Sequence, residues 1–478
     1  MRRWILPVVL LLIAGFSAWQ AVRTDDALAA QGELVTAFPG QGLATNLVSI
    51  RRTPEYLRAP VILETFIDDL DALTAEFPPA SCLVVSAGGE ELFTHNASQP
   101  LVPASAQKLV TAYGVYEILG TDRTYTTRLV TDAQVVDGVL DGDLWIVGGG
   151  DPLLATSDYV DRYEDPQVFS DLEVLADAIV AAGITEITGA VIGDESRYDL
   201  ERYVPGWPER FIDQNQTGPL SALTVNDGFE RYDAENTAPS LATATRAPAS
   251  FAAAFFDDLL EERDLVIRGS ATEGPAPVGA RDIVEPLESE PIVAVTNQML
   301  SVSDNMGAEL LVKEIGLAET GVGTTDEGVL AIESKLRSSG FTTAETNVVD
   351  GSGLAENKTT CRLLVEILDA SLDTTPMLEG LAVAGESGTL RERLVGTPAE
   401  GRIAAKTGRL NEVGALAGVA YAEDDTRLTF AWIGNTTDFY EVEAMTAAQD
   451  ALALELVEYP EGPSVEDLAP LGSVAPAG

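Results

Sequence analysis

Histidine and cysteine are scarce in this chain of 478 residues, which has one histidine, His95, and two cysteines, Cys82 and Cys361. A structural zinc site needs about four such ligands, so we predict no metal site of this kind. We also predict no cofactor. A Ser-His-Asp or Cys-His mechanism would have to use His95 as its base, and we interpret His95 as a structural residue beside a hairpin instead. The two cysteines lie far apart in the chain, and the sequence leaves open whether they form a disulfide.

Basic residues are also few, because 29 lysines and arginines face 76 aspartates and glutamates, for a net charge of -47. Such a charge repels phosphate backbones and anionic lipid surfaces, so we predict no nucleic-acid partner. The hydrophobic content of 46% is enough for substantial cores. At this length two or three globular units are expected.

One long apolar run occurs, over residues 4–22, with Arg2 and Arg3 before it and Asp25 and Asp26 after it. This pattern is typical of an export signal that leaves the body of the protein on the outer side of the membrane. We predict that residues 1–23 are either a signal peptide, which is removed, or an uncleaved membrane anchor, and a buried core helix is the alternative. Contact with a membrane is expected through this segment alone. Residues 24–60 are rich in Gly, Pro and polar residues and are predicted to be a linker. Residues 460–478 are predicted to be a disordered tail.

Hydrophobic periodicity and turn residues predict the main elements. Helices are expected over residues 61–77, 104–119, from 292 onward, and 442–457. Two hairpins are expected, one pairing residues 82–87 with 91–94 and one pairing 413–422 with 426–433. Between residues 125 and 286, short apolar runs such as 144–147 and 187–192 alternate with Gly, Pro and Asp clusters, which indicates one or more inserted subdomains that contain β-structure.

Ser105 and Lys108 lie one helical turn apart near the start of the predicted helix that follows Pro103. This spacing places a hydroxyl and an amine on one face. Burial and the positive end of the helix dipole would both lower the lysine pKa, so Lys108 could take the proton of Ser105. The backbone amides of that turn also suit an oxyanion hole. The alternative interpretation of the same spacing is an ordinary exposed helix turn.

Lysine is rare enough to make its positions informative. The lysines of the chain are Lys108, Lys313, Lys335, Lys358 and Lys406. Ser303-Asp304-Asn305 lies between two predicted helices and supplies a hydroxyl and an amide, although these residue types are also common helix N-caps. Lys406-Thr407-Gly408 follows a predicted strand over residues 402–405 that ends at the motif, and it supplies a cation, a hydroxyl and a glycine that permits close approach.

The three motifs, in this order, are those of β-lactamases and penicillin-binding proteins. Over residues 49–459 the chain resembles the class C low-molecular-mass penicillin-binding proteins, the D-alanyl-D-alanine carboxypeptidase/endopeptidase family. Further segments that resemble family signatures are 93–96 with 103–105, 148–152, 349–354, 388–390 and 396–398. The long separation of Ser105 from Ser303 also resembles this class, in which inserted domains divide the first two motifs.

The resemblance implies an α/β (α+β) fold like that of DD-peptidases and β-lactamases, with an antiparallel sheet flanked by helices and a smaller inserted β-containing domain or domains. Residues 61–124 and 287–459 would then form the two parts of a transpeptidase-like domain, with residues 125–286 inserted between them.

The resemblance also implies the roles of the site residues. Ser105 is the nucleophile, Lys108 the general base, and Ser303 and Asn305 relay a proton and hold the substrate amide. Lys406 and Thr407 recognise the terminal carboxylate, and Gly408 contributes to substrate binding by letting the substrate backbone approach closely. Arg409 departs from the Thr or Ser usual after the glycine, and its guanidinium could bind the carboxylate in place of that hydroxyl.

The expected function is hydrolysis of the D-Ala-D-Ala bond of peptidoglycan stem peptides, or of cross-links between them, by an exported cell-envelope enzyme that β-lactams inhibit covalently. Two alternatives remain from the sequence. One is a catalytically weak or silent peptidoglycan-binding protein, and the other is a β-lactamase or esterase on the same scaffold.

Overall fold

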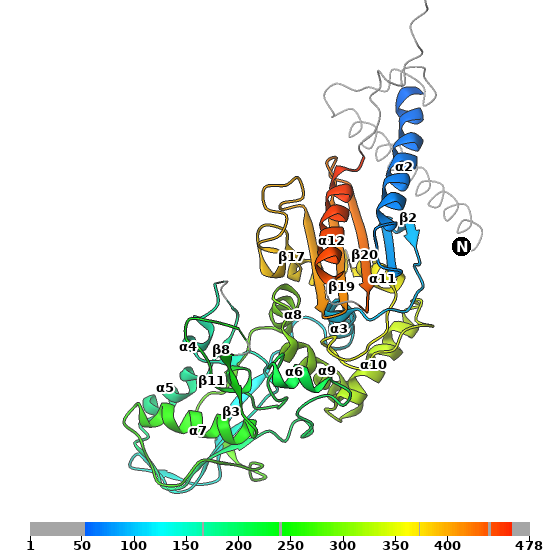
Figure 1. Ribbon diagram of the computed structural model, residues 1–478. Coiled ribbons are helices and arrows are strands. Elements are labelled where there is room, and N and C mark those ends of the chain that lie inside the picture. Colours follow the sequence, from blue (N-terminus) through cyan, green and yellow to red (C-terminus); the bar gives the residue numbers. More distant parts are fainter. Residues whose placement is uncertain (1–52, 165–166, 239–240, 372, 438–440, 461–478) are drawn as a thin grey trace, which may run out of the picture. The chain divides into compact units, whose positions relative to one another are not determined.

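The computed structural model describes residues 53–164, 167–238, 241–371, 373–437 and 441–460 (Figure 1). The segments predicted as signal or anchor (1–23), most of the linker (24–60) and nearly all of the tail (460–478) lie outside these residues. The chain divides into a unit of residues 1–62 with 462–478 and a unit of residues 63–461. Of the first unit only the start of helix α2 (Thr53–Thr74) is described, so everything below concerns the second. No helix within the described residues is both long and apolar enough to cross a membrane.

A six-stranded antiparallel sheet forms the centre of this unit. Its strands, in spatial order, are β17 (Ala382–Val383), β18 (Ile403–Leu410), β19 (Val413–Tyr421), β20 (Arg427–Asn435), β1 (Ala80–Ala87) and β2 (Glu90–His95). Both predicted hairpins are confirmed, as β1–β2 and β19–β20. The first hairpin pairs with the second because β1 lies antiparallel to β20 along its whole length. The predicted antiparallel sheet of an α/β (α+β) fold is thereby confirmed.

Helices cover both faces of this sheet, and the alternation of side chains along β19 shows how. Leu416 points to the face covered by α2 and α12 (Glu441–Glu458), where it joins a core with Phe66 and Leu452. Ala415 and Ala417 point to the opposite face. The helices on that face are α3 (Gln107–Gly114), α8 (Ile292–Ser301), α9 (Asn305–Thr320), α10 (Thr325–Ser338) and α11 (Cys361–Ser371). Two small alanines therefore face the helix that follows Ser105, which lets that helix approach the sheet closely.

The predicted helix over residues 104–119 is present as three consecutive pieces. It begins as the 3-10 turn η1 (Ala104–Ala106), continues as α3 and ends in a π-helical turn (Val115–Leu119). Gly120, with φ +80°, ends it as predicted.

Cys82 and Cys361 form a disulfide that joins β1 to the first residue of α11, with their Cα atoms 5.9 Å apart. The question that the sequence left open is thus settled in favour of pairing.

Residues 126–288 form further sheets with a core of their own. One sheet has the order β14 (Thr272–Glu273), β10 (Val191–Asp194), β6 (Leu144–Val147), β3 (Thr126–Thr131) and β15 (Arg281–Asp282), and β16 (Leu287–Glu288) also pairs with β3. The other has the order β13 (Val266–Ile267), β9 (Glu186–Ile187), β5 (Val139–Leu140) and β4 (Val135–Val136). Helices α5 (Glu173–Ala181) and α7 (Pro248–Glu261) pack on them.

Two predicted strands need correction. The run predicted as one strand over residues 187–192 is split between β9 and β10, because the chain passes within contact of Gly142 and Asp143 at Gly189 and turns between sheets there. The strand predicted to end at Ala405 continues to Leu410, because every residue from Ile403 to Leu410 pairs with β19. The Lys406-Thr407-Gly408 motif therefore lies inside a strand rather than after one.

Candidate active site

Ser105 lies in the turn η1, immediately before α3, and is half-buried. Ala104 before it adopts a left-handed backbone with φ +47°, a strained conformation for a residue with a β-carbon. Gly353 packs directly on this turn, since a β-carbon at 353 would lie 2.0 Å from the Ala104 carbonyl oxygen and 3.0 Å from the Ser105 nitrogen. The position of Ser105 is thus fixed by a segment far from it in the sequence.

Lys108 is fully buried, so the alternative interpretation as an exposed helix turn is wrong. Its Nζ lies 3.1 Å from Ser105 Oγ, 2.7 Å from Asn305 Oδ1 and 2.7 Å from the Ser352 carbonyl oxygen. A neutral amine would donate its two hydrogens to the two oxygens that can only accept, Asn305 Oδ1 and Ser352 O, which leaves its lone pair directed at Ser105. Lys108 is therefore placed to act as a base toward the Ser105 hydroxyl.

Burial lowers the pKa of Lys108 to about 8, because desolvation disfavours the ammonium form. The carboxylates of Asp350, Glu309 and Asp304 act in the opposite direction. A useful fraction of Lys108 is therefore neutral near physiological pH, as a general base requires.

Ser303, Asp304 and Asn305 lie between α8 and α9 as predicted. Asn305, the first residue of α9, bridges two parts of the site: its Oδ1 accepts from Lys108 and its Nδ2 donates to the Gln216 carbonyl oxygen at 2.7 Å. Ser303 is half-buried with φ +66°, and no hydrogen bond joins it to Ser105 or Lys108 within the described part of the chain. Asp304 occupies the N-cap position of α9. The interpretation of this motif as a helix N-cap therefore applies to Asp304.

Lys406 lies on β18 and is fully buried, with its Nζ 3.0 Å from the Thr407 carbonyl oxygen. Burial first, and then the nearby charge of Lys108, hold its pKa well below the usual value. The packing of β18 on the Ser105 turn brings the first and third motifs together, so the two lysines repel each other. An anion in the site would relieve this repulsion.

Gly408 brings β18 against the Ser105 turn, and Thr407 and Arg409 flank it on the strand. A β-carbon at 408 would lie 2.6 Å from the Pro103 carbonyl oxygen and 3.1 Å from the Ala106 nitrogen. Thr407 Oγ1 donates to Thr389 Oγ1 at 2.8 Å. Arg409 is exposed, and its guanidinium has no ion pair or hydrogen bond with any residue that the structure describes.

His95 lies at the end of β2, away from these residues. Its Nε2 is 2.9 Å from Asn96 Nδ2, and its ring packs edge-on against Phe77 with 6.5 Å between ring centroids. These contacts match the structural role expected for it.

Four residues around Lys108 were not predicted as site residues: Gln216, Glu309, Asp350 and Ser352. Ser352 supplies a carbonyl to Lys108, and Glu309 accepts the Ser352 amide at 2.8 Å. Asp350 accepts the amides of Gly353 and Ala355 at 2.8 and 2.6 Å. Segment 349–354 resembles a family signature, but the sequence alone assigns it no role. Glu309 could have been suspected, because it follows Asn305 by one helical turn.

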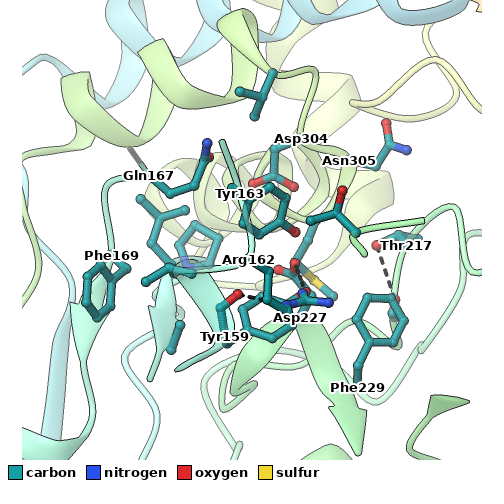
Figure 2. Close-up of a pocket in the computed structure, with 18 of the residues that line it drawn as sticks. Tyr159, Arg162, Tyr163, Gln167, Phe169, Thr217, Asp227, Phe229, Asp304 and Asn305 are labelled. Atoms are coloured by element: carbon teal, nitrogen blue, oxygen red, sulfur yellow. Dashed lines mark hydrogen bonds between the residues drawn. The ribbon is translucent and has the colours of Figure 1, made fainter. Parts of the chain in front are cut away.

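A cavity of about 300 Å³ adjoins Ser303, Asp304 and Asn305 (Figure 2). Figure 2 shows Asp304 and Asn305 on one side of it and Tyr159, Asp227 and Phe229 on the other. Tyr159 Oη donates to Asp227 Oδ2 at 2.7 Å. The carboxylate of Asp227 is enclosed although the residue is partly exposed, and burial, with Asp304 nearby, raises its pKa to about 7.

The guanidinium of Arg162, which lines this cavity, lies 4.1 Å from the ring centroid of Tyr159, 4.5 Å from that of Tyr232 and 5.5 Å from that of Tyr163. The cavity thus combines aromatic faces with charges of both signs, a lining that suits a polar ligand with an apolar body.

Comparison with known proteins identifies the relatives of this chain. A family model described as the D-Ala-D-Ala carboxypeptidase 3 (S13) family matches residues 67–240 and 233–456. The chain is 28% identical over 480 residues to a D-alanyl-D-alanine carboxypeptidase of Actinomadura sp. (strain R39), covering 83% of this chain and 86% of that one. It is 30% identical over 380 residues to a carboxypeptidase of Mycobacterium tuberculosis, covering 77% of each.

Among solved structures, penicillin binding protein 4 of Haemophilus influenzae superposes with a TM-score of 0.69 at 21% identity, covering 81% of this chain and 98% of that one. At this identity the likeness concerns the fold. The same protein in complex with a β-lactam superposes with a TM-score of 0.64 at 20% identity, covering 81% and 99%.

Proposed function

The chain belongs to the D-Ala-D-Ala carboxypeptidase 3 (S13) family, and from that membership we propose that Ser105 is its nucleophile and Lys108 its general base. Its activity is that of a serine-type D-alanyl-D-alanine carboxypeptidase. The observation that carries the assignment is the buried Lys108 amine 3.1 Å from Ser105 Oγ. Neutral Lys108 takes the hydroxyl proton while Ser105 Oγ attacks the carbonyl carbon of the penultimate D-Ala.

The tetrahedral intermediate then collapses to an ester on Ser105. The C–N bond to the terminal D-Ala breaks, and the leaving amine receives a proton that Ser303 helps to relay from Lys108. Water adds to the ester carbonyl and releases the shortened peptide and free Ser105. The backbone amides of Ser105 and Arg409 stabilise the oxyanion, and the Asn305 amide holds the peptide beside Lys108.

We assign recognition of the terminal carboxylate to Lys406, Thr407 and Arg409. Lys406 is buried beside Lys108, so an anion in the cleft offsets an unfavourable pair of positive charges. Gly408 permits the substrate backbone to approach β18. Arg409 stands where related proteins usually carry a hydroxyl. Its exposed guanidinium, which has no partner among the described residues, suits a bidentate carboxylate contact.

The acyl side of the stem peptide enters the cavity beside Asn305. Support comes from the residues that line this cavity of about 300 Å³. Ser303, Asp304 and Asn305 face residues of segment 125–286 across it. Residues 125–286 act in this proposal as an inserted domain that completes the peptide-binding cleft between the two parts of the transpeptidase-like domain.

We place the activity in the cell envelope, on the outer face of the membrane, because peptidoglycan is the substrate. Residues 1–23 then serve as signal peptide or anchor, and β-lactams act as covalent inhibitors because they present a strained amide to the same serine. An acidic protein of net charge -47 acts here on an anionic polymer through a locally cationic cleft.

The test is labelling of the protein lacking residues 1–30 with a fluorescent penicillin, with mass mapping of the modified peptide and a Ser105→Ala control. A stable adduct on Ser105, absent in the variant, is expected, together with release of D-Ala from a peptide ending in D-Ala-D-Ala. Rapid turnover of the penicillin would indicate a β-lactamase. Absence of both adduct and turnover would indicate a peptidoglycan-binding protein without catalysis.

A further inference from the structure

Glu309 lies on α9 one turn after Asn305 and is completely buried beneath the site. Its two carboxylate oxygens accept neighbouring backbone amides: Oε1 accepts the Ser352 N–H at 2.8 Å, and Oε2 accepts the Gly351 N–H at 3.3 Å. Burial first, and then the nearby Asp350, raise the pKa of Glu309 to about 8, while the hydrogen bonds from Ser352 and Gly351 act in the opposite direction. A buried carboxylate in such a place requires a reason, because an apolar residue would be cheaper to bury.

The segment that Glu309 holds supplies the third partner of Lys108. The Ser352 carbonyl accepts from Lys108 Nζ at 2.7 Å. Thr111 of α3 holds the adjacent Gly351 carbonyl at 2.7 Å. These contacts fix the Gly351–Ser352 peptide from α9 on one side and from the helix that carries Lys108 on the other. The next peptide, which bears the Ser352 carbonyl, is held at its Gly353 N–H by Asp350 Oδ1 at 2.8 Å.

This carbonyl matters because of the proton that Lys108 must accept. A neutral amine has two hydrogens and one lone pair, and three neighbours surround it here. When Asn305 Oδ1 and Ser352 O accept the two hydrogens, the lone pair is left for the Ser105 hydroxyl at 3.1 Å. If the Ser352 carbonyl moved, the amine could rotate and the lone pair would point elsewhere.

We propose that Glu309 is a positioning residue for the catalytic base: through the amides of Gly351 and Ser352 it holds the Ser352 carbonyl where it orients the lone pair of Lys108 toward Ser105. This inference rests on the proposed function, because it requires Lys108 to act as a base. Glu309 does not line the cavity beside Asn305, so it acts on the chemical step rather than on the binding of substrate.

The experiment measures the maximal rate of acylation by a fluorescent penicillin, and the non-covalent affinity for it, in the wild type, Glu309→Gln and Glu366→Gln. Glu366 is a matched control, because it too accepts a backbone amide and a hydroxyl, from Thr342 at 2.8 Å each, on the surface of α11. We expect Glu309→Gln to lower the maximal rate about 10- to 100-fold and to leave the non-covalent affinity unchanged. Glu366→Gln should match the wild type.

Glu309→Asp provides an independent variant if the glutamine variant does not fold. It keeps a carboxyl group but is too short to hold both amides, so the maximal rate should fall while the non-covalent affinity stays at the wild-type value. A wild-type rate for either variant, or a fall in non-covalent affinity that accounts for the slower acylation, would overturn the inference. Failure of the wild type to form an adduct on Ser105 would instead overturn the proposed function, so the two failures are distinguishable.

Discussion

Gly408 and Pro103 lie so close together that a β-carbon on residue 408 would come within 2.6 Å of the Pro103 carbonyl oxygen. Backbone atoms of β18 and of the Ser105 turn would both have to shift to accept it. We expect Gly408→Ala to lower the rate of acylation by penicillin about 100-fold, because small displacements of a nucleophile relative to its partners have effects of that size. Stopped-flow measurement with a fluorescent penicillin checks this.

The matched control is Gly274→Ala, since a β-carbon there would meet only Ile192 Cγ2, at 3.9 Å. This variant should acylate at the wild-type rate. Equal rates for the two alanine variants would show that the close approach of β18 to the Ser105 turn has no part in catalysis.

The pH dependence of acylation follows from Lys108. Its folded-state pKa is lowered to about 8, so below that pH it is mostly the ammonium, which cannot accept the Ser105 proton, and above it mostly the amine. The acylation rate should therefore rise with pH through about 8 and then level off. Lys108→Arg should be inactive across the range, because the guanidinium stays protonated. A rate that is constant or falls between about pH 6 and pH 10 would contradict the assignment of Lys108 as base.

Asn305 offers a sharper test of the assignment of Lys108 as the base. Asn305→Asp would place a carboxylate 2.7 Å from Lys108 Nζ, where an opposite charge favours the ammonium. The pKa of Lys108 should rise, so the acylation profile should move to higher pH and the rate near neutral pH should fall by about tenfold or more.

Asn305→Ala serves as the control for that variant. It removes the acceptor without adding charge, so it should slow acylation without moving the profile upward. If the aspartate and alanine variants had the same profile, the Asn305 side chain would not be in electrostatic contact with the base in solution.

Sequence patterns predicted the elements whose signals are local. The hairpin turn at Gly88 and Gly89 and the helix between Pro103 and Gly120 depend on residues next to one another, and both are present. The motif at Lys406 was assigned to a strand end rather than a strand interior. The pairing of β18 with β19, which the run of residues 402–405 does not reveal, extends the strand to Leu410.

The surroundings of Lys108 could be predicted only in part. Ser105 and Lys108 are a turn apart, so their proximity follows from a helix. The Ser352 carbonyl and the Glu309 carboxylate reach them from segments that are distant in the sequence and are brought there by packing. A backbone carbonyl also has no side-chain signature, so no residue type at position 352 could have revealed its role.

The disulfide between Cys82 and Cys361 closes a loop across a sequence separation of 279 residues and ties β1 to α11. Constraining so long a loop reduces the conformational freedom of the unfolded chain, which stabilises the folded state by typically about 2–4 kcal/mol. We expect the variant with both cysteines replaced by alanine to unfold at lower temperature and lower denaturant concentration. A reductant should lower the melting temperature of the wild type toward that of the variant and leave the variant unchanged. If calorimetry gave the same melting temperature for both proteins under oxidising conditions, the link between β1 and α11 would contribute nothing to stability.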